Sequence, residues 1–214
     1  ANGWYVSNVV VDAAATDNLS GISSVVVSDN GGAAKPVPVT LTSGTHALTI
    51  TAKDVAGNSH STTLNLTIDT DGPIITSSIT GTEGNNNWYV SDVDVTATVS
   101  DPTSGMDGTL EVSVDGGAWT TDLPVHFTEG GHTIDLRAYD EAGNESIKTL
   151  TINVDTTPPA LSTSTSGAPG NSGWYVSDAT TTISATDSTS GIDYIEYKQN
   201  SVGWKNGTSV PSRD

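Results

Sequence analysis

One pattern of residues occurs three times along the 214-residue chain, and this repetition constrains the fold more than any other feature of the sequence. The tetrapeptide Trp-Tyr-Val-Ser begins at Trp4, Trp88 and Trp174, at nearly equal intervals. A chain that repeats itself in this way is built from copies of one structural unit, each of which interacts mainly with its neighbours. The sequence therefore predicts an array of similar units rather than one large domain.

Further landmarks repeat in the same register and set the boundaries of the units. The pattern Asp-x-x-Ser-Gly begins three times, and the pattern Asp-x-Ala-Gly-Asn occurs twice, at residues 54–58 and 140–144. We expect repeat 1 to span residues 1–70, repeat 2 residues 71–156 and repeat 3 residues 157–214. By this alignment repeat 1 lacks a first strand and repeat 3 lacks its last two strands. We expect strands of a longer chain or of a neighbouring molecule to complete repeat 3.

The residue pattern within one repeat favours strands. Apolar residues alternate with polar ones from Val93 to Ser100, which is typical of a strand with one buried face. Turn residues such as Asp115-Gly116-Gly117 separate such segments. The predicted strands of repeat 2 are residues 74–80, 93–100, 110–114, 118–121, 125–128, 132–139 and 147–154. About seven short strands at regular spacing indicate a sandwich of two sheets.

The order of these motifs carries a family resemblance. The segments WYVSxVxVxAxxxD, SGI, DGGxW, GGHTIxLRAYDEAGNES and VDTTPP together resemble the bacterial immunoglobulin-like (Ig-like) repeats of large secreted and cell-surface proteins. The resemblance implies an all-β fold of tandem Ig-like or fibronectin-III-like antiparallel β-sandwiches, arranged as an extended rod. It also implies an extracellular or cell-surface location, with neighbouring repeats of the same protein as the main partners.

Composition and charge exclude several classes of function. The formal net charge is −18 and the sequence pI is about 4.1, so the chain would repel a nucleic acid. No apolar run is long enough to cross a bilayer, so we expect no membrane insertion. Cysteine is absent, which rules out disulfides and thiolate metal ligands. No catalytic motif is present, and we expect no enzymatic activity and no cofactor other than calcium.

Aspartates at strand ends and unit junctions are the candidate metal ligands. Calcium takes six to eight oxygen ligands and favours carboxylates gathered from loops. An ion bound between units would screen the acidic surface and stiffen the joint. The alternative is turn chemistry, in which each Asp side chain bonds its own backbone. The candidate ligands are Asp17, Asp54, Asp69, Asp71, Asp101, Asp140, Asp155 and Asp187.

Aromatic residues raise a second possibility, glycan binding. Trp119 and Trp204 follow the third strand of their repeats, and an exposed aromatic face suits a pyranose ring. The repeated Trp-Tyr pairs, in contrast, favour packing in the core or at the end of each sandwich. His46 and His132 recur at one place in successive repeats, which indicates a packing role in a turn rather than proton transfer.

Three functional hypotheses remain, and the first is preferred. The repeats form a non-catalytic spacer or stalk of a bacterial extracellular protein, such as an adhesin or a filament-like surface structure. Alternatively, they form a carbohydrate-binding accessory module of a secreted glycan-degrading enzyme. In the third hypothesis the chain is a subunit that polymerises with other copies by strand exchange at its incomplete terminal repeats.

Overall fold

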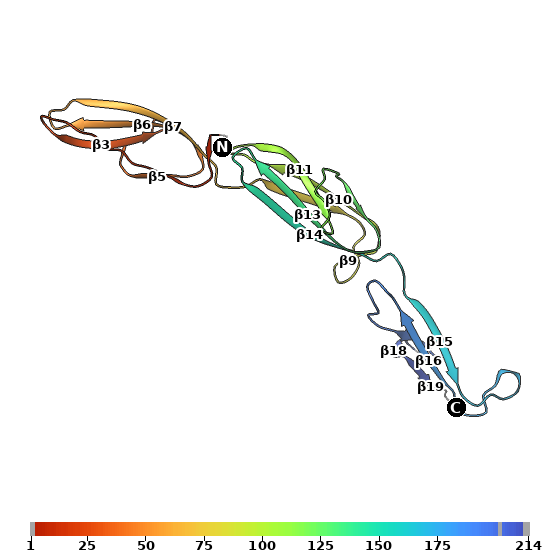
Figure 1. The fold of residues 1–214 in the computed structure, drawn as a ribbon. Coiled ribbons are helices and arrows are strands. Elements are labelled where there is room, and N and C mark those ends of the chain that lie inside the picture. Colours follow the sequence, from red (N-terminus) through yellow and green to blue (C-terminus); the bar gives the residue numbers. More distant parts are fainter. Residues whose placement is uncertain (1–2, 201–202, 212–214) are drawn as a thin grey trace. The chain divides into compact units, whose positions relative to one another are not determined.

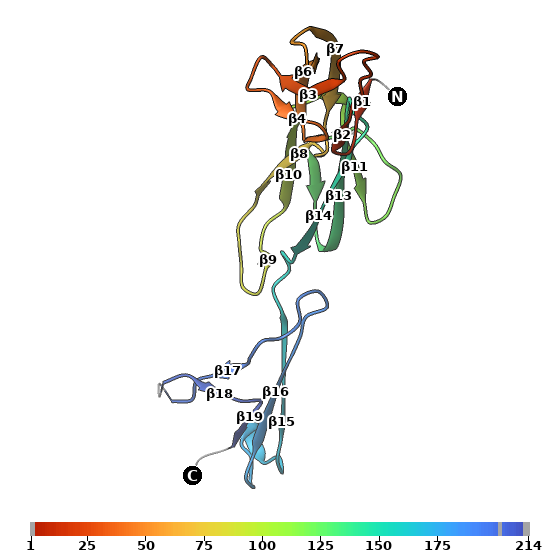
Figure 2. The same cartoon turned by 90° about the vertical axis from the view of Figure 1, so that its left-hand side faces the viewer.

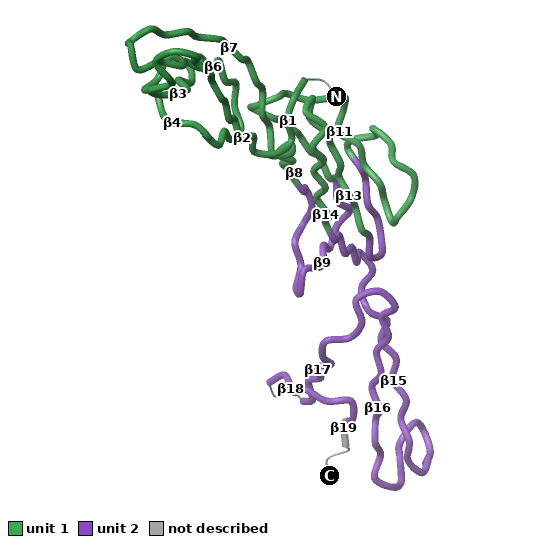
Figure 3. The backbone as a smooth tube through the Cα atoms, turned by 60° about the vertical axis from the view of Figure 1, so that its left-hand side comes forward, with its two compact units in different colours: residues 1–78, 95–124, 133–150 green, residues 79–94, 125–132, 151–214 purple. Residues whose placement is uncertain are grey.

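The computed structural model describes residues 3–200 and 203–211, and strands form nearly all of the regular structure in these ranges. The other residues belong to the expected repeats 1 and 3 and lie outside the described part. The backbone divides into two compact units (Figure 3). One comprises residues 1–78, 95–124 and 133–150, and the other comprises residues 79–94, 125–132 and 151–214.

Repeat 1 is a sandwich of two sheets (Figure 1). The larger sheet has the strand order β1-β7-β6-β3-β4, and the smaller one pairs β2 with β5. Strands β6 and β7 pair in antiparallel register from Gly44↔Ile68 to Lys53↔Ser59. The strands are β1 (Trp4–Tyr5), β2 (Val9–Val11), β3 (Ile22–Asp29), β4 (Lys35–Pro36), β5 (Val39–Leu41), β6 (Gly44–Asp54) and β7 (Ser59–Ile68).

The core of repeat 1 follows from the alternation along these strands. Every second residue of a strand points to the same face, so strand positions of equal parity reach the interior. Each fully buried Leu or Ile side chain contributes about 1.5–3 kcal/mol relative to an exposed one. Six buried side chains, contributed by both sheets, form one cluster: Val11, Val27, Leu41, Leu48, Leu66 and Ile68.

Repeat 2 contains a three-stranded sheet in the order β12-β10-β8 and a four-stranded sheet in the order β11-β13-β14-β9. The strands are β8 (Ile74–Thr80), β9 (Trp88–Tyr89), β10 (Val93–Ser100), β11 (Met106–Val114), β12 (Val125–Phe127), β13 (Gly130–Asp140) and β14 (Glu145–Val154). The predicted strands 74–80 and 93–100 are confirmed with the same bounds. The predicted all-β sandwich is also confirmed.

One predicted strand of repeat 2 is much shorter than expected. In residues 118–121 the structure gives a single bridge, in which the N–H and C=O groups of Thr120 both bond Val112, at 2.8 and 2.7 Å. The chain leaves the sheet soon after, at Leu123-Pro124. Proline has no N–H group to donate, so the ladder cannot continue through it.

The described residues of repeat 3 form fewer strands than either of the other repeats. Its sheets have the orders β15-β16-β19 and β17-β18 (Figure 2). Its elements are β15 (Ala160–Ser166), the 3₁₀ helix η1 (Asn171–Gly173), β16 (Thr180–Thr186), β17 (Glu196–Tyr197), β18 (Lys205–Asn206) and β19 (Ser209–Pro211). All seven residues of β15 are exposed. Among the described side chains after residue 155, none belongs to a buried hydrophobic residue.

In repeats 1 and 2 the Trp-Tyr pair forms a short strand that pairs in parallel with the last strand of its own repeat. Trp4 lies opposite Thr67, and Trp88 lies opposite Asn153. The carbonyl of the tyrosine accepts a hydrogen bond of 2.8 Å from the N–H of the aspartate that closes the repeat, in both cases. Both tryptophans are half-buried, so they pack at the end of the sheet. Trp174 of repeat 3 is 77% exposed.

Candidate functional site

Each Asp-x-x-Ser-Gly segment is a turn that its own aspartate caps. Oδ1 of the aspartate accepts hydrogen bonds from the N–H groups two, three and four residues later, at 2.7–3.1 Å. The fifth residue of the motif is a glycine with φ between 81° and 87°, a conformation that only glycine adopts without strain. The hydrogen bonds and the backbone conformation of the turn are therefore enough to explain this motif. It occurs at Asp17, Asp101 and Asp187.

In the Asp-x-Ala-Gly-Asn corner the aspartate also accepts hydrogen bonds from the backbone of its own turn, and the asparagine side chain is an additional donor. In repeat 1 the Asn58 amide donates to Oδ2 of Asp54 at 2.8 Å, and the Asn58 N–H donates to Oδ1 at 2.7 Å. The Asn58 side chain, followed by the backbone N–H groups, lowers the pKa of Asp54. Amides from Gly21 and Leu19 likewise lower the pKa of Asp17. These two carboxylates are thus held ionised by hydrogen bonds.

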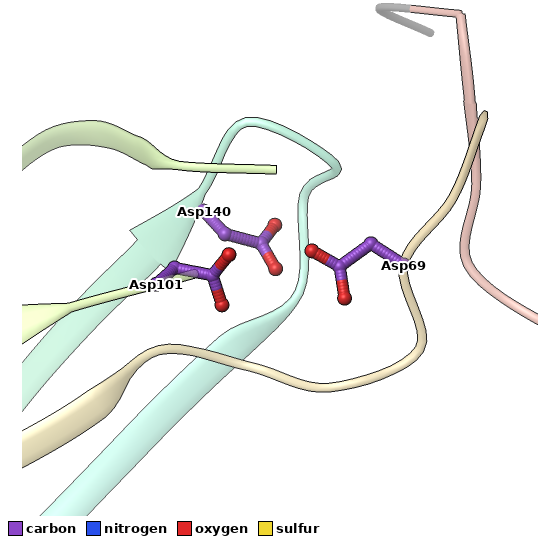
Figure 4. A group of neighbouring side chains, drawn as sticks. All are labelled: Asp69, Asp101 and Asp140. Carbon is purple, nitrogen blue, oxygen red and sulfur yellow. The ribbon is translucent and has the colours of Figure 1, made fainter. Parts of the chain in front are cut away.

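Three aspartates come together where repeat 1 ends and repeat 2 begins. Asp69 follows β7, Asp101 follows β10 and Asp140 ends β13. One carboxylate oxygen of each lies within 4.8 Å of the corresponding oxygens of the other two (Figure 4). Asp69 and Asp140 are fully buried and Asp101 is half-buried. Residues that are far apart in the sequence thereby form one acidic cluster, which we call the junction triad.

Hydrogen bonds from repeat 2 hold the junction triad to the chain that leaves repeat 1. The Ser104 N–H donates to Oδ2 of Asp69 at 3.0 Å. The side-chain amide of Asn144 donates to the carbonyls of Asp69 and Asp71, at 3.0 and 3.1 Å. It also donates to Oδ2 of Asp140, at 2.7 Å. Asn144 is thus a bridging residue, which the sequence marked only as part of a repeated corner.

The geometry of the junction triad fits a divalent cation. Calcium–oxygen distances are about 2.3–2.6 Å, so two oxygens bound to one ion lie at most about 5 Å apart. Two buried carboxylates and a half-buried one at this spacing repel one another unless a cation or protons compensate their charge. Among the described residues, the Oγ of Ser104 is also buried and has no hydrogen-bond partner. Asp69, Asp101 and Asp140 are therefore the candidate calcium ligands that the structure brings together.

The remaining predicted ligands lie elsewhere or play other parts. Asp71 donates its N–H to Oδ1 of Asp69, at 3.2 Å, and its carbonyl binds Asn144. Asp17 and Asp54 cap turns of repeat 1. Asp155 and Asp187 both accept a hydrogen bond from the Ser190 N–H, at 3.0 Å each.

A second acidic junction therefore exists at the start of repeat 3. Hydrogen bonds from Ser190 outweigh burial and lower the pKa of Asp155. Glu129 joins this region through Thr156, whose N–H and hydroxyl donate to Oε2 at 2.8 and 2.9 Å, and through the hydroxyl of Thr189. In the described part of the chain, only the junction triad forms a group of three carboxylates close enough for one metal ion.

The two candidate glycan-binding tryptophans differ in their surroundings. The guanidinium carbon of Arg137 lies 4.1 Å from the ring centroid of Trp119 and 5.5 Å from that of Tyr139. Nε and Nη2 of Arg137 donate to Oε2 of Glu111 at 3.0 and 2.7 Å. Trp119 is half-buried, and a cation covers one of its faces. Trp204 is 67% exposed.

Comparison with known protein families identifies the repeats. The family model described as a bacterial Ig-like domain matches residues 5–70 and 90–156, which is more than half of the chain. The chain belongs to the bacterial Ig-like domain family. A comparison with curated proteins found no match.

Two solved structures are similar at low identity. The first, fibronectin(III)-like modules of Clostridium thermocellum CbhA, is 16% identical with a TM-score of 0.29, covering 71% of this chain and 87% of that one. The second, a tetra-tandem repeat in the extending region of a large adhesion protein, is 14% identical with a TM-score of 0.25, covering 88% of this chain and 56% of that one.

The family assignment confirms a tandem array of bacterial Ig-like domains. Domains of this kind are typically structural and non-catalytic, and this is the role that the family match supports. No helix in the described residues is long and apolar enough to cross a membrane.

Proposed function

We propose that these Ig-like repeats are a spacer or stalk of a bacterial extracellular or surface protein, in which each junction fixes how one repeat follows the next. The observation that carries the proposal is the set of contacts at the first junction. Asp69 and Asp71, which belong to the connection between repeats 1 and 2, are bound by Ser104 and Asn144 of repeat 2. A connection tied down in this way restricts the joint more than a free linker does.

Calcium at the junction triad is the second part of the proposal. An ion shared by Asp69, Asp101 and Asp140 would join the end of repeat 1 to two loops of repeat 2 and neutralise buried charge. A ligand that binds only the folded state stabilises it by RT ln(1 + [L]/Kd), which is about 2.7 kcal/mol at one hundred times Kd. The support for this part is the spacing of the three carboxylates and the burial of Asp69 and Asp140.

The experiment measures the calcium and spacer parts separately. Calcium is titrated into the chelator-treated chain by calorimetry and by thermal unfolding, with Asp140→Asn as the test variant and Asp54→Asn as its matched control. We expect calcium to raise the unfolding temperature of the native chain and of the control but not of Asp140→Asn. An unchanged unfolding temperature in the native chain would contradict the calcium part alone.

The spacer part has its own measurement. Spin labels at exposed positions Val10 and Ile147, one in each of the first two repeats, report the distribution of distances across the first junction. We expect a single narrow distribution, which Asn144→Ala broadens. A broad distribution in the native chain, with calcium and without it, would contradict the spacer proposal itself.

Carbohydrate binding is the second candidate function, and exposed aromatic side chains favour it. In repeat 3, Trp174, Tyr194 and Trp204 are 77%, 64% and 67% exposed. Such rings offer free faces to a sugar, whereas Arg137 covers one face of Trp119. A glycan array tests the idea with Trp204→Ala and Trp119→Ala. Binding that is lost in Trp204→Ala but kept in Trp119→Ala would support it, and an array without signal would remove it.

A further inference from the structure

Repeat 1 has an open hollow where its interior reaches the surface. The hollow has a volume of about 560 Å³ and is lined by residues 13–17, which follow β2, and by strands β3, β6 and β7. Ile50 and Ala52 continue the interior-facing positions of β6 beyond Leu48, so the hollow is an extension of the core. We call it the repeat 1 groove. The apolar residues that line it include Ala13, Ala15, Ile22, Val25, Ile50 and Ala52.

Repeat 2 is closed at the equivalent place. Leu136 and Ala138 are the counterparts of Ile50 and Ala52, because each pair lies at the same distance from the Asp-x-Ala-Gly-Asn corner of its repeat. Leu136 and Ala138 are fully buried, whereas Ile50 and Ala52 are only half-buried. In repeat 2 the strand β8 is bonded to β10 in the order β12-β10-β8. The described residues of repeat 1 form only the equivalents of β10 and β12, which are β2 and β5.

The backbone along the groove ends its strand early. β10 runs from Val93 to Ser100, but its counterpart β2 stops at Val11, and residues 12–16 belong to no strand. Ala13 and Ala15 are nevertheless half-buried and alternate with exposed residues, as their counterparts in β10 do. Residues 12–16 thus keep the alternation of a strand without the ladder. Such a free edge is a template on which an added strand forms hydrogen bonds.

The strand β8 of repeat 2 shows which kind of segment fits such a groove. Ile75 and Ser77 are half-buried and alternate with exposed residues, so β8 turns every second side chain toward the interior. Nζ of Lys148 donates to the carbonyl of Ile75 at 3.5 Å. A Cβ added to Gly72 would lie 2.7 Å from Oγ of Ser146. The chain that enters β8 therefore runs close along Ser146 and Lys148 of β14.

The rim of the repeat 1 groove follows the same path and adds a constraint on charge. His60 and Thr62, which stand where repeat 2 has these two residues of β14, both line the groove. Asp17 and Asp54 also line it, and hydrogen bonds lower the pKa of both carboxyl groups. No lysine or arginine is among the described residues of the lining. An acidic segment would therefore be repelled, whereas residues 72–80, which include β8, carry no charged side chain.

We propose that the repeat 1 groove binds an extended, uncharged segment with the residue pattern of β8. The segment adds a strand to the free edge of β2 and residues 12–16, and it places an apolar side chain over Ile50 and Ala52. Main-chain hydrogen bonds supply affinity in this mode of binding, and the alternate side chains supply specificity. The bound sandwich then has the closed interior that repeat 2 already has. This inference does not depend on calcium or on the spacer role.

The first test titrates a synthetic peptide of residues 72–80 into the full chain and follows the backbone amides by NMR. We expect shift changes and slower amide exchange in residues 12–16 and at Ile50 and Ala52. The buried counterparts Leu136 and Ala138 are the internal control and should not change. A peptide with Ile75→Asp should bind at least about tenfold more weakly, because it loses the apolar side chain and brings a carboxylate to an acidic rim.

The second test blocks the groove from within. Ala52→Phe places a ring in the hollow and should abolish binding of the peptide. Ala47→Phe is the matched control, because Ala47 lies on the exposed face of the same strand, and this variant should bind as the native chain does.

Three results would overturn the proposal. The first is a native chain whose amides do not respond even to millimolar peptide. The second is equal binding of the native peptide and the Ile75→Asp peptide, which would show that the contact is not specific for the pattern of β8. The third is a change in residues 12–16 with protein concentration in the absence of peptide, which would show that a second copy of the chain occupies the groove. The first two measurements use the native chain, so they hold even if Ala52→Phe does not fold.

Discussion

The repeated aspartates occupy positions where a short carboxylate replaces missing backbone partners. Asp101 accepts three consecutive N–H groups with one oxygen, as the turn around Gly105 requires. All three amides bond Oδ1, so none of them occupies Oδ2. The same side chain can therefore cap its turn through one oxygen and offer the other to a metal ion. A carboxylate fixed by its own turn is already oriented toward its neighbours, and a site built from such groups is preorganised.

Asn144 provides a prediction at the same scale. Asn144→Ala removes the donor that serves the carbonyls of Asp69 and Asp71 and the carboxylate of Asp140. Because Asp69 and Asp140 are fully buried, the lost bonds leave buried acceptors unsatisfied, at a cost of about 1–3 kcal/mol. Urea unfolding followed by tryptophan fluorescence should show a lower midpoint.

The matched control is Asn58→Ala in repeat 1. The side chain of Asn58 bonds Asp54 within its own corner, and Asp54 is only half-buried. We expect this variant to lower the midpoint less than Asn144→Ala does. Equal losses in the two variants would show that Asn144 acts only within its corner and does not hold the junction.

At the scale of strands and turns, alternation and turn chemistry predict most of the fold. The alternation along β10 is enough to predict this strand, because its odd and even positions differ sharply in polarity. The bounds of the strand agree with the prediction. The parallel pairing of β1 with β7 and of β9 with β14 could not be predicted, because a two-residue strand is too short to show an alternation of apolar and polar residues. The junction triad was predicted only as scattered acidic residues, since the distances between loops depend on packing that the sequence pattern does not contain.

The loop that carries the Trp-Tyr strand gives a prediction at the element scale. A Cβ added to Gly81 would lie 2.8 Å from Cγ2 of Val93 and 3.1 Å from the Tyr89 ring. Val93 is fully buried and cannot move without disturbing the core, so Gly81→Ala should cost about 1–3 kcal/mol by overpacking. Thermal unfolding followed by circular dichroism measures the loss.

Gly203→Ala is the control for this substitution, because a Cβ at Gly203 would have no atom within 4 Å. We expect the unfolding temperature of this variant to stay within error of the native value. A Gly81→Ala variant as stable as the native chain would show that the loop shifts freely, and that the Trp-Tyr strand is not locked onto its repeat.

At the scale of the whole chain, each of the first two repeats has a core of its own. The buried hydrophobic residues with the lowest exposure in repeat 2 lie between Val93 and Val154, and the core cluster of repeat 1 lies between Val11 and Ile68. A segment that contains its entire core can fold alone if the core is large enough. The bacterial Ig-like family match to both segments agrees with this organisation.

Excision of repeat 2 tests this independence. A fragment of residues 71–156 should fold and unfold cooperatively in urea, as followed by tryptophan fluorescence. Its midpoint should be lower than that of a fragment of residues 68–156, because the longer fragment retains the carboxylate and carbonyl of Asp69, which Ser104 and Asn144 bind. A disordered shorter fragment would contradict the predicted boundary, and equal midpoints would show that Asp69 adds nothing to repeat 2.

The last prediction concerns repeat 3, which has strands but no buried hydrophobic residue among its described side chains. Leu161 in β15 is 70% exposed, and a small sheet without an apolar interior opens at low cost. Hydrogen exchange measured on peptides covering β15 and β16 should therefore be fast, whereas peptides covering β13 and β14 should stay protected.

Slow exchange in β15 and β16 would have two explanations, coverage by other copies of the chain or stability of repeat 3 by itself. Measurements at several protein concentrations distinguish them. If β15 and β16 exchange slowly only at high concentration, other copies of the chain cover their apolar residues, as strand exchange between subunits requires. Slow exchange that does not depend on concentration would contradict the prediction, because it would show that repeat 3 is stable without a buried core. Fast exchange at every concentration would confirm the prediction and remove strand exchange at this repeat as a route to polymers.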